Sequence, residues 1–475
     1  MVRANRLPLI AGLVLVLGAA LRLPGLWTDL QLDEVWSLQN AFAANSWFDL
    51  LRLKIDNNHH LTSMYMYALG PDTAAVVYRL LAYISGVAVV ALAWLVGSRD
   101  SPMTAVVTAV LFATSAAFVF YSSEARGYTT AVCLMLVAWY CLRRYAESPR
   151  PRWLLGFAMS SIAGVMSHQT FVLFYLGAFI WCDAHTQKHH RLRDATRLTM
   201  RMFALPTVGI GVFAVIALAG QQIGGGFPFE VPVILAQTLA LVAGGPQYGS
   251  GLWLVAAVVG GITVAAVWSA YRLGDDRWFL YLAAGVIAPA IIMFLRRPPT
   301  LAPRYFLVPA TVLLLAVARF LALAIEHGGT RRALAGALIG AQAIAGVWFT
   351  LSPNASRGGY RAALTRIVQQ SAGVTTVASA GHFGGSEWRT DMMVRHYASA
   401  IGARGRLRYV PAAQAAVDGA DWVIDESPDN APPPASISDA NGREYTLDRT
   451  YPAGPLSGIT WQVYRQRLAA GLDTH

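Results

Sequence analysis

Charged residues are scarce in this chain. Of its 475 residues only 13% are Asp, Glu, Lys or Arg, whereas 55% are hydrophobic. Ordinary soluble domains carry about 25% charged residues. Many apolar runs here approach the roughly 20 residues needed to cross a bilayer. The composition therefore excludes an ordinary soluble domain and predicts a polytopic α-helical membrane protein.

Cysteine and lysine are also rare. The three cysteines, Cys133, Cys141 and Cys182, all lie in apolar segments, so we expect neither a disulfide framework nor a cysteine metal site. Lys54 and Lys188 are the only lysines, and the net charge of +11 comes almost entirely from arginine. Together with abundant Ala and Gly, this bias indicates a bacterial protein, and we expect it in the plasma (inner) membrane.

Apolar segments recur along residues 1–352, which we interpret as the transmembrane domain. The first segment is not followed by a signal-peptide cleavage site, so we expect it to remain as a span. We expect about eleven transmembrane helices, at 7–23, 74–97, 103–120, 127–142, 153–167, 169–184, 202–220, 251–271, 278–295, 305–326 and 333–351.

Arginine and lysine are unevenly distributed among the connections between these spans. With a cytoplasmic N-terminus, about 16 of them fall inside and about 6 outside, as the positive-inside rule requires. This orientation places loop 24–73, the turn at 121–126, loops 221–250 and 296–304, and residues 353–475 outside. We interpret the basic run at 185–201 as a cytoplasmic topology anchor near anionic lipids, and we expect no nucleic-acid partner.

Two outer regions have structure of their own. Loop 24–73 has apolar residues at helical spacing near 34–52 and 60–70, which predicts interfacial helices. Residues 353–475 contain short buried-strand patterns at 375–380, 407–410 and 422–424, with helices between them and further edge strands at 446–450 and 460–465. This alternation predicts a small soluble α/β domain outside the membrane.

The stretch around Asp33 and Glu34 is the first candidate for chemistry. Both acids open a predicted helix just past the first span, where a carboxylate could remove a proton from a hydroxyl of a lipid-borne substrate. The alternative is that they only start the helix, since acids favour a first turn.

Three further groups of polar residues fall on the outer side. His59 and His60 could bind a metal or orient a phosphate, or form a polar turn. Glu124 and Arg126 could contact a sugar or only pair with each other. Arg296, Arg297 and Arg304 break the positive-inside rule directly before a span, and guanidinium groups bind phosphate in a bidentate way; the alternative is simple headgroup binding.

The order of these motifs resembles the GT-C glycosyltransferases, in particular the family 39-like group related to protein O-mannosyltransferases and the lipid A aminoarabinose transferase. The resemblance covers about 350 residues. It rests on Asp33-Glu34, His59-His60-Leu61, Tyr121-Ser122-Ser123-Glu124-Ala125-Arg126 and Arg304-Tyr305-Phe306-Leu307. His60-Leu61-Thr62 departs from the His-Pro-Pro-Leu form that is common in the family.

The resemblance implies an inverting transfer of one sugar from a polyprenyl-phosphate donor to a lipid, glycan or protein acceptor at the outer face. Asp33 would be the catalytic base, and Arg304, with Arg296, Arg297 and Tyr305, would bind the lipid phosphate. The residues implied to shape the substrate pocket are Glu34, His59, His60, Glu124 and Arg126; His168, in a short outer turn, could join them or only form a polar turn. A divalent metal is used by some relatives and not by others, so the cofactor stays open.

Two other functions fit the composition. A transporter or flippase of lipid-linked sugars is disfavoured because the span interiors are almost free of Asp and Glu. A non-catalytic envelope assembly protein would use the outer domain to bind a partner.

Overall fold

The computed structural model describes residues 6–53, 58–221, 229–296, 299–381, 386–427, 432–439 and 441–467. The chain forms two compact units. The helical unit consists of residues Met1–Trp27 and Asn40–Leu351, and the C-terminal unit consists of Thr28–Gln39 and Ser352–His475. The segment that carries Asp33 and Glu34 therefore belongs to the C-terminal unit.

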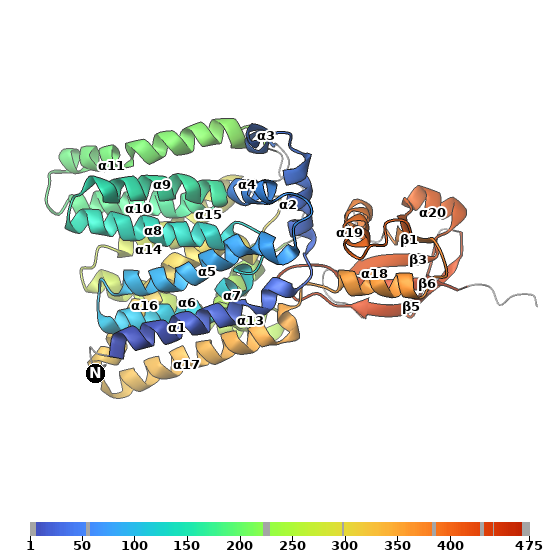
Figure 1. Ribbon diagram of the computed structural model, residues 1–475. Helices are drawn as coiled ribbons and strands as arrows, with labels where there is room; N and C mark the ends of the chain where they lie inside the picture. The colour runs from blue at the N-terminus through green and yellow to red at the C-terminus, as the bar shows by residue number, and fades with distance from the viewer. Residues whose placement is uncertain are drawn as a thin grey trace, which may run out of the picture. The chain divides into compact units, whose positions relative to one another are not determined.

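Long helices lie side by side in the helical unit (Figure 1). The helices of this unit outside the first loop are α1 (Leu7–Arg22), α5 (Ala75–Gly97), α6 (Pro102–Thr114), α7 (Ala116–Tyr121), α8 (Tyr128–Glu147), α9 (Pro151–Ser167), α10 (Phe171–Thr186), α11 (Leu192–Phe213), α12 (Val231–Val242), α13 (Gly249–Arg272), α14 (Trp278–Leu282), α15 (Ala288–Arg296), α16 (Leu307–His327) and α17 (Gly329–Leu351). Short π-helical turns, η3 (Ala214–Leu218) and η4 (Ala283–Ile287), extend α11 and join α14 to α15.

Every expected span overlaps one or more of these helices. Within the described residues, seven helices are long and apolar enough to cross a membrane, and α6, α10 and α12 are apolar but shorter. This confirms a polytopic helical membrane protein, while the number eleven stays a prediction. Helix α12 falls in a stretch that we expected to be an outer loop.

The first loop is helical, as expected. Helices α2 (Leu32–Ala43), α3 (Trp47–Arg52) and α4 (His60–Leu69) fill it, after the 3₁₀ turn η2 (Pro24–Trp27). The predicted helix at 34–52 is thus two helices, and Ser46 separates them: its side chain caps α3 by accepting a hydrogen bond from the Asp49 N–H at 3.2 Å.

Buried Arg22, the last residue of α1, repairs a break in a neighbouring helix. The backbone is extended at Ser115, so α6 and α7 are separate helices, and carbonyls before the break lose their helical donors. Arg22 donates from its guanidinium group to the carbonyls of Phe112 (3.0 Å) and Ala113 (3.2 Å), and to the Ser122 hydroxyl (3.1 Å). Non-helical backbone at membrane depth requires such partners.

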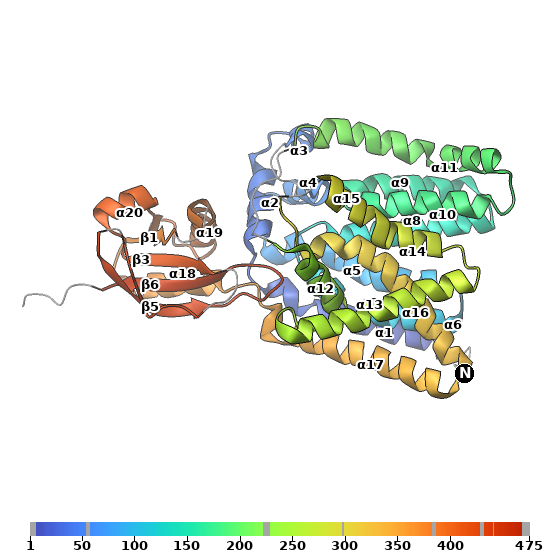
Figure 2. The same cartoon turned by 180° about the vertical axis from the view of Figure 1, so that it is seen from behind.

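The C-terminal unit is built on one mixed sheet with the order β2-β1-β3-β6-β5-β4. Its strands are β1 (Thr375–Ser379), β2 (Leu407–Tyr409), β3 (Trp422–Ser427), β4 (Ser436–Ser438), β5 (Glu444–Tyr451) and β6 (Thr460–Gln466). Strands β2, β1 and β3 are parallel, and β6 runs antiparallel to β3. Helices α18 (Tyr360–Gln369), α19 (Ser386–Ala400) and α20 (Ala412–Asp418) complete the unit, and α18 covers one face of the sheet (Figures 1 and 2).

The predicted α/β class of this unit is confirmed, but the expected edge positions of its last strands are wrong. Strand β6 lies between β3 and β5, and the outer edge is β4, which the sequence did not predict. The reason is visible in the burial of β6: its first five residues are all buried, as in a strand that is covered on both faces.

We predict that Arg22→Met destabilises the protein by about 3 kcal/mol or more, because each buried carbonyl left without a donor costs roughly 1–3 kcal/mol. Thermal unfolding in detergent measures the loss. Arg193→Met, at an exposed position, is the control and should leave the transition within about 0.5 kcal/mol. Equal melting temperatures for the two variants would contradict this role of Arg22.

Candidate active site

Turns far apart in the sequence meet around the ring of Tyr128, the first residue of α8. The ring centroid of Tyr128 lies 4.7 Å from that of His59, 4.8 Å from that of His168 and 6.4 Å from that of Tyr305. His59 precedes α4, His168 lies in the turn between α9 and α10, and Tyr305 lies in η5 (Pro303–Phe306) before α16. We call these residues, with Arg126 and Arg304, the Tyr128 cluster.

The backbone of Gly127 holds His59 in place. The Nδ1 atom of His59 accepts a hydrogen bond from the Gly127 N–H at 3.1 Å and lies 3.2 Å from the Ser167 carbonyl oxygen. Any side chain at position 127 would clash, because a Cβ atom there would lie 2.0 Å from that carbonyl oxygen. Glycine is thus required for this close approach of the two turns.

His168 presents a buried N–H donor to the cluster. Its Nδ1 lies 2.6 Å from the Thr170 hydroxyl oxygen and accepts a hydrogen bond from the Thr170 N–H at 3.2 Å; with Nδ1 as the acceptor, the proton of the neutral ring is on Nε2. Nε2 is buried and has no hydrogen-bond acceptor within the described parts of the chain. Burial, followed by the charges of Arg126 and Arg304, lowers the pKa of His168 to about 3, so the ring is neutral at pH 7.

The Tyr128 cluster has a positive potential. The guanidinium carbons of Arg126 and Arg304 lie 5.9 Å and 6.0 Å from the Tyr128 ring centroid. Burial is the main reason why the pKa of His59 lies well below its usual range, and Arg126, His168 and Arg304 lower it further. Two guanidinium groups beside neutral histidines favour an anion such as a phosphate.

The other predicted residues of the helical unit have different surroundings. His60 packs its ring edge-on against Phe213 at 5.1 Å, as a core histidine would. Glu124 is fully buried in the turn of Arg126, whose N–H donates to the Glu124 carbonyl oxygen at 2.7 Å. Arg296 ends α15, and Arg297 lies outside the described residues.

Asp33 and Glu34 differ in their environments. The Glu34 carboxylate is buried and accepts a hydrogen bond from the Gln31 N–H at 2.9 Å, and the Gln31 carbonyl accepts the first backbone bonds of α2. This is one half of a capping box, as the helix-starting alternative expects. Asp33 is only half-buried in the same turn.

The described residues contain no group of three His, Cys, Asp or Glu side chains that could hold a metal ion. Asp56, which precedes the two histidines in the sequence, lies outside the described residues.

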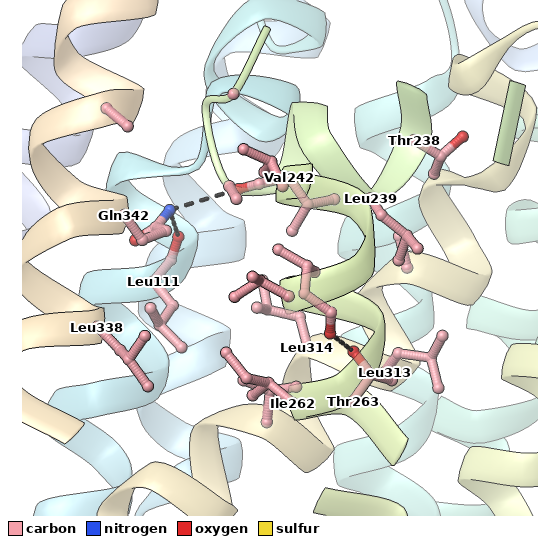
Figure 3. Close-up of a pocket in the computed structure, with 18 of the residues that line it drawn as sticks. Leu111, Thr238, Leu239, Val242, Ile262, Thr263, Leu313, Leu314, Leu338 and Gln342 are labelled. Atoms are coloured by element: carbon pink, nitrogen blue, oxygen red, sulfur yellow. Dashed lines mark hydrogen bonds between the residues drawn. The ribbon is translucent and has the colours of Figure 1, made fainter. Parts of the chain in front are cut away.

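An apolar pocket of about 560 Å³ lies between α6, α12, α13, α16 and α17 (Figure 3). Leu239, Ile262, Leu313 and Leu338 line it, and Gln342 is one of its few polar side chains. The lining extends from Phe306 in η5 to Leu321 on α16, a helical length of roughly 22 Å. The pocket begins two residues after Arg304, and its volume is within the usual range for ligand sites.

Comparisons with known proteins give one family and one fold. Residues 62–216, about a third of the chain, match a sequence model of the dolichyl-phosphate-mannose-protein mannosyltransferase family. No curated protein matches the chain.

Two solved structures are similar over nearly the whole chain. The structure of ArnT from Cupriavidus metallidurans in the apo state matches this protein with a TM-score of 0.52 and 12% sequence identity. The match covers 97% of this chain and 97% of the ArnT chain. The structure of the same ArnT bound to undecaprenyl phosphate matches with a TM-score of 0.50 and 12% sequence identity, over 99% of this chain and 99% of the ArnT chain. Residues 62–216 are therefore similar to the dolichyl-phosphate-mannose-protein mannosyltransferases, and the chain as a whole has the same fold as ArnT.

Proposed function

We propose that this protein transfers a single sugar, with inversion, from a polyprenyl-phosphate donor to a lipid, glycan or protein acceptor at the outer face of a bacterial plasma membrane. The observation that carries the proposal is the Tyr128 cluster, in which Arg126, Arg304 and the buried ring of His168 all lie close to the Tyr128 ring. The family match and the fold support glycosyl transfer as the reaction class. ArnT binds undecaprenyl phosphate in one of the matching structures, which favours the same kind of donor here.

The phosphate of the donor is assigned to the Tyr128 cluster. Arg304 can engage two phosphate oxygens with its planar fork, and the Nε2–H of His168 can donate to a third. These donors stabilise the charge that grows on the phosphate as its bond to the sugar breaks. His59 and His168 are both neutral, so the positive charge that the cluster offers to the phosphate comes from its arginines alone.

The isoprenoid chain of the donor is assigned to the apolar pocket. A single helical turn, η5, carries Arg304 and also Phe306, which lines the pocket. In a donor whose phosphate is bound at Arg304, the isoprenoid chain attached to that phosphate would therefore enter the apolar pocket along α16. Leu254 and Val258 on the pocket wall are 68% and 49% exposed, so the chain could enter from the bilayer.

The proposed catalytic base is Asp33. Its carboxylate takes the proton of the acceptor hydroxyl, the hydroxyl oxygen bonds to the anomeric carbon, and the bond from that carbon to the phosphate oxygen breaks with its electron pair on the phosphate. Glu34 is occupied by the cap of α2, so the two adjacent acids have separate roles. Glu124, in the turn of Arg126, would contact sugar hydroxyls.

Purified protein with a radiolabelled polyprenyl-phosphate sugar tests the reaction. Release of polyprenyl phosphate and transfer of label to an envelope extract are expected. Movement of intact donor between leaflets of a vesicle, without loss of sugar, would instead indicate a transporter. If the sugar is not transferred and the donor does not move between leaflets, the result favours the non-catalytic envelope assembly protein.

We predict that Arg304→Lys lowers kcat/KM by about 10²-fold, since the charge stays but the bidentate geometry is lost. The assay above measures it, with Arg331→Lys at an exposed position as the matched control. Full turnover in Arg304→Lys would remove Arg304 from the phosphate site.

For the lipid chain, we predict that Ala310→Phe raises the donor KM about tenfold with little change in kcat, because the new ring occupies volume along α16. Ala337→Phe, exposed on α17 outside the pocket lining, should not change KM. A water-soluble donor with a short isoprenoid chain should be affected less; equal effects on both donors would argue against this pocket.

We predict that Asp33→Asn lowers transfer by about 10²–10⁴-fold, the usual contribution of a positioned base, with donor binding nearly unchanged. Glu34→Gln keeps an oxygen that can accept the Gln31 N–H, so its loss should be much smaller. Kinetics of both variants separate the roles: an inactive Glu34→Gln beside an active Asp33→Asn would reverse them.

A further inference from the structure

The segment that carries Asp33 is held by residues of the later part of the C-terminal unit, Ser352–His475. Four successive residues of this segment each make a contact with that part of the chain. Thr28 accepts a hydrogen bond from Arg357 at 3.0 Å, and Asp29 accepts one from the Arg361 N–H at 2.8 Å. The Leu30 carbonyl accepts from the Tyr397 hydroxyl at 2.7 Å, and the Gln31 side-chain oxygen accepts from the Gly458 N–H at 3.1 Å.

These contacts end at the cap of α2. Gln31 binds Gly458 with its side chain, while its N–H binds Glu34 and its carbonyl begins the helix. One turn later, the Trp36 ring lies 5.2 Å from that of Trp388 on α19. Asp33 lies between these two attachment points, so their geometry fixes the direction in which the first turn of α2 presents its carboxylate.

We propose that the C-terminal unit positions the catalytic base, with Tyr397 as the main positioning residue. This inference rests on the proposed function, because it requires Asp33 to be the base. Tyr397 is 1% exposed and donates to a backbone carbonyl three residues before Asp33. Its hydroxyl therefore holds the main chain itself, and loss of the bond would let the entry to α2 shift.

The chain offers a matched control in Tyr464. This residue is equally buried, in the centre of the sheet, and its hydroxyl lies 3.2 Å from two acceptors, the Pro434 carbonyl oxygen and Gln462 Oε1, neither of which belongs to residues 28–39. Tyr397→Phe and Tyr464→Phe each remove one buried hydroxyl and leave the ring. Each should cost about 1 kcal/mol of stability, but only the first should disturb the base.

The kinetic experiment uses the full-length protein and the labelled donor. Tyr397→Phe should lower kcat roughly 10- to 100-fold, as expected for a displaced catalytic group, with an unchanged donor KM. Tyr464→Phe should have wild-type kcat. If Asp33→Asn inactivates the enzyme but Tyr397→Phe has the same kcat as wild type, Tyr397 does not position the base. The proposed function would still stand. Equal losses in both tyrosine variants would also overturn it, because they would reflect stability alone.

Hydrogen exchange of the peptide 28–39 gives a readout that does not depend on activity. Exchange should be faster in Tyr397→Phe than in wild type, and unchanged in Tyr464→Phe. If the wild-type protein transfers no sugar, the proposed function fails, and exchange alone then decides whether Tyr397 holds this segment. Identical exchange in all three proteins would refute that hold.

Discussion

The need to pair every polar backbone group in an apolar environment determines how the candidate site is built. The break at Ser115 frees carbonyls within the helical unit, and the guanidinium group of Arg22 pairs with them. The same group holds the Ser122 hydroxyl, at the start of the turn that contains Glu124 and Arg126. A residue that repairs the backbone thus also anchors one of the turns that form the Tyr128 cluster.

Burial then determines the charge of the cluster. An imidazole in this environment stays neutral, since the pKa of His168 falls to about 3, whereas arginine keeps its charge in proteins. The lowered pKa of His168 also makes the stability of the folded protein depend on pH. The histidine is protonated in the unfolded chain below its ordinary pKa of about 6.5 but remains neutral in the folded protein, so it makes folding less favourable as the pH falls below that value.

The sequence predicts those features that depend on periodicity and composition. Apolar runs located the helices of the helical unit other than α12, the spacing in loop 24–73 located α2, α3 and α4, and short buried-strand patterns located β1 to β3. It does not reveal features that depend on tertiary partners. Arg22 appears as a residue at the end of a span, and the order of β6 in the sheet depends on which strand it pairs with. His59 and His60 are adjacent in sequence, yet one contacts Tyr128 and the other Phe213, because neighbouring residues at a helix start point in different directions.

Asp33 and Glu34 present the same problem in its sharpest form. As residue types they are interchangeable for proton transfer, and both favour the first turn of a helix. What separates them is the position within the capping box: Glu34 is the third helical residue, from which a side chain reaches back to the N-cap N–H of Gln31. Asp33 has a shorter side chain one position earlier and does not occupy that place. The contact of Gln31 with Gly458 then fixes the cap itself, so the distinction between the two acids depends on residues more than 400 positions later in the chain.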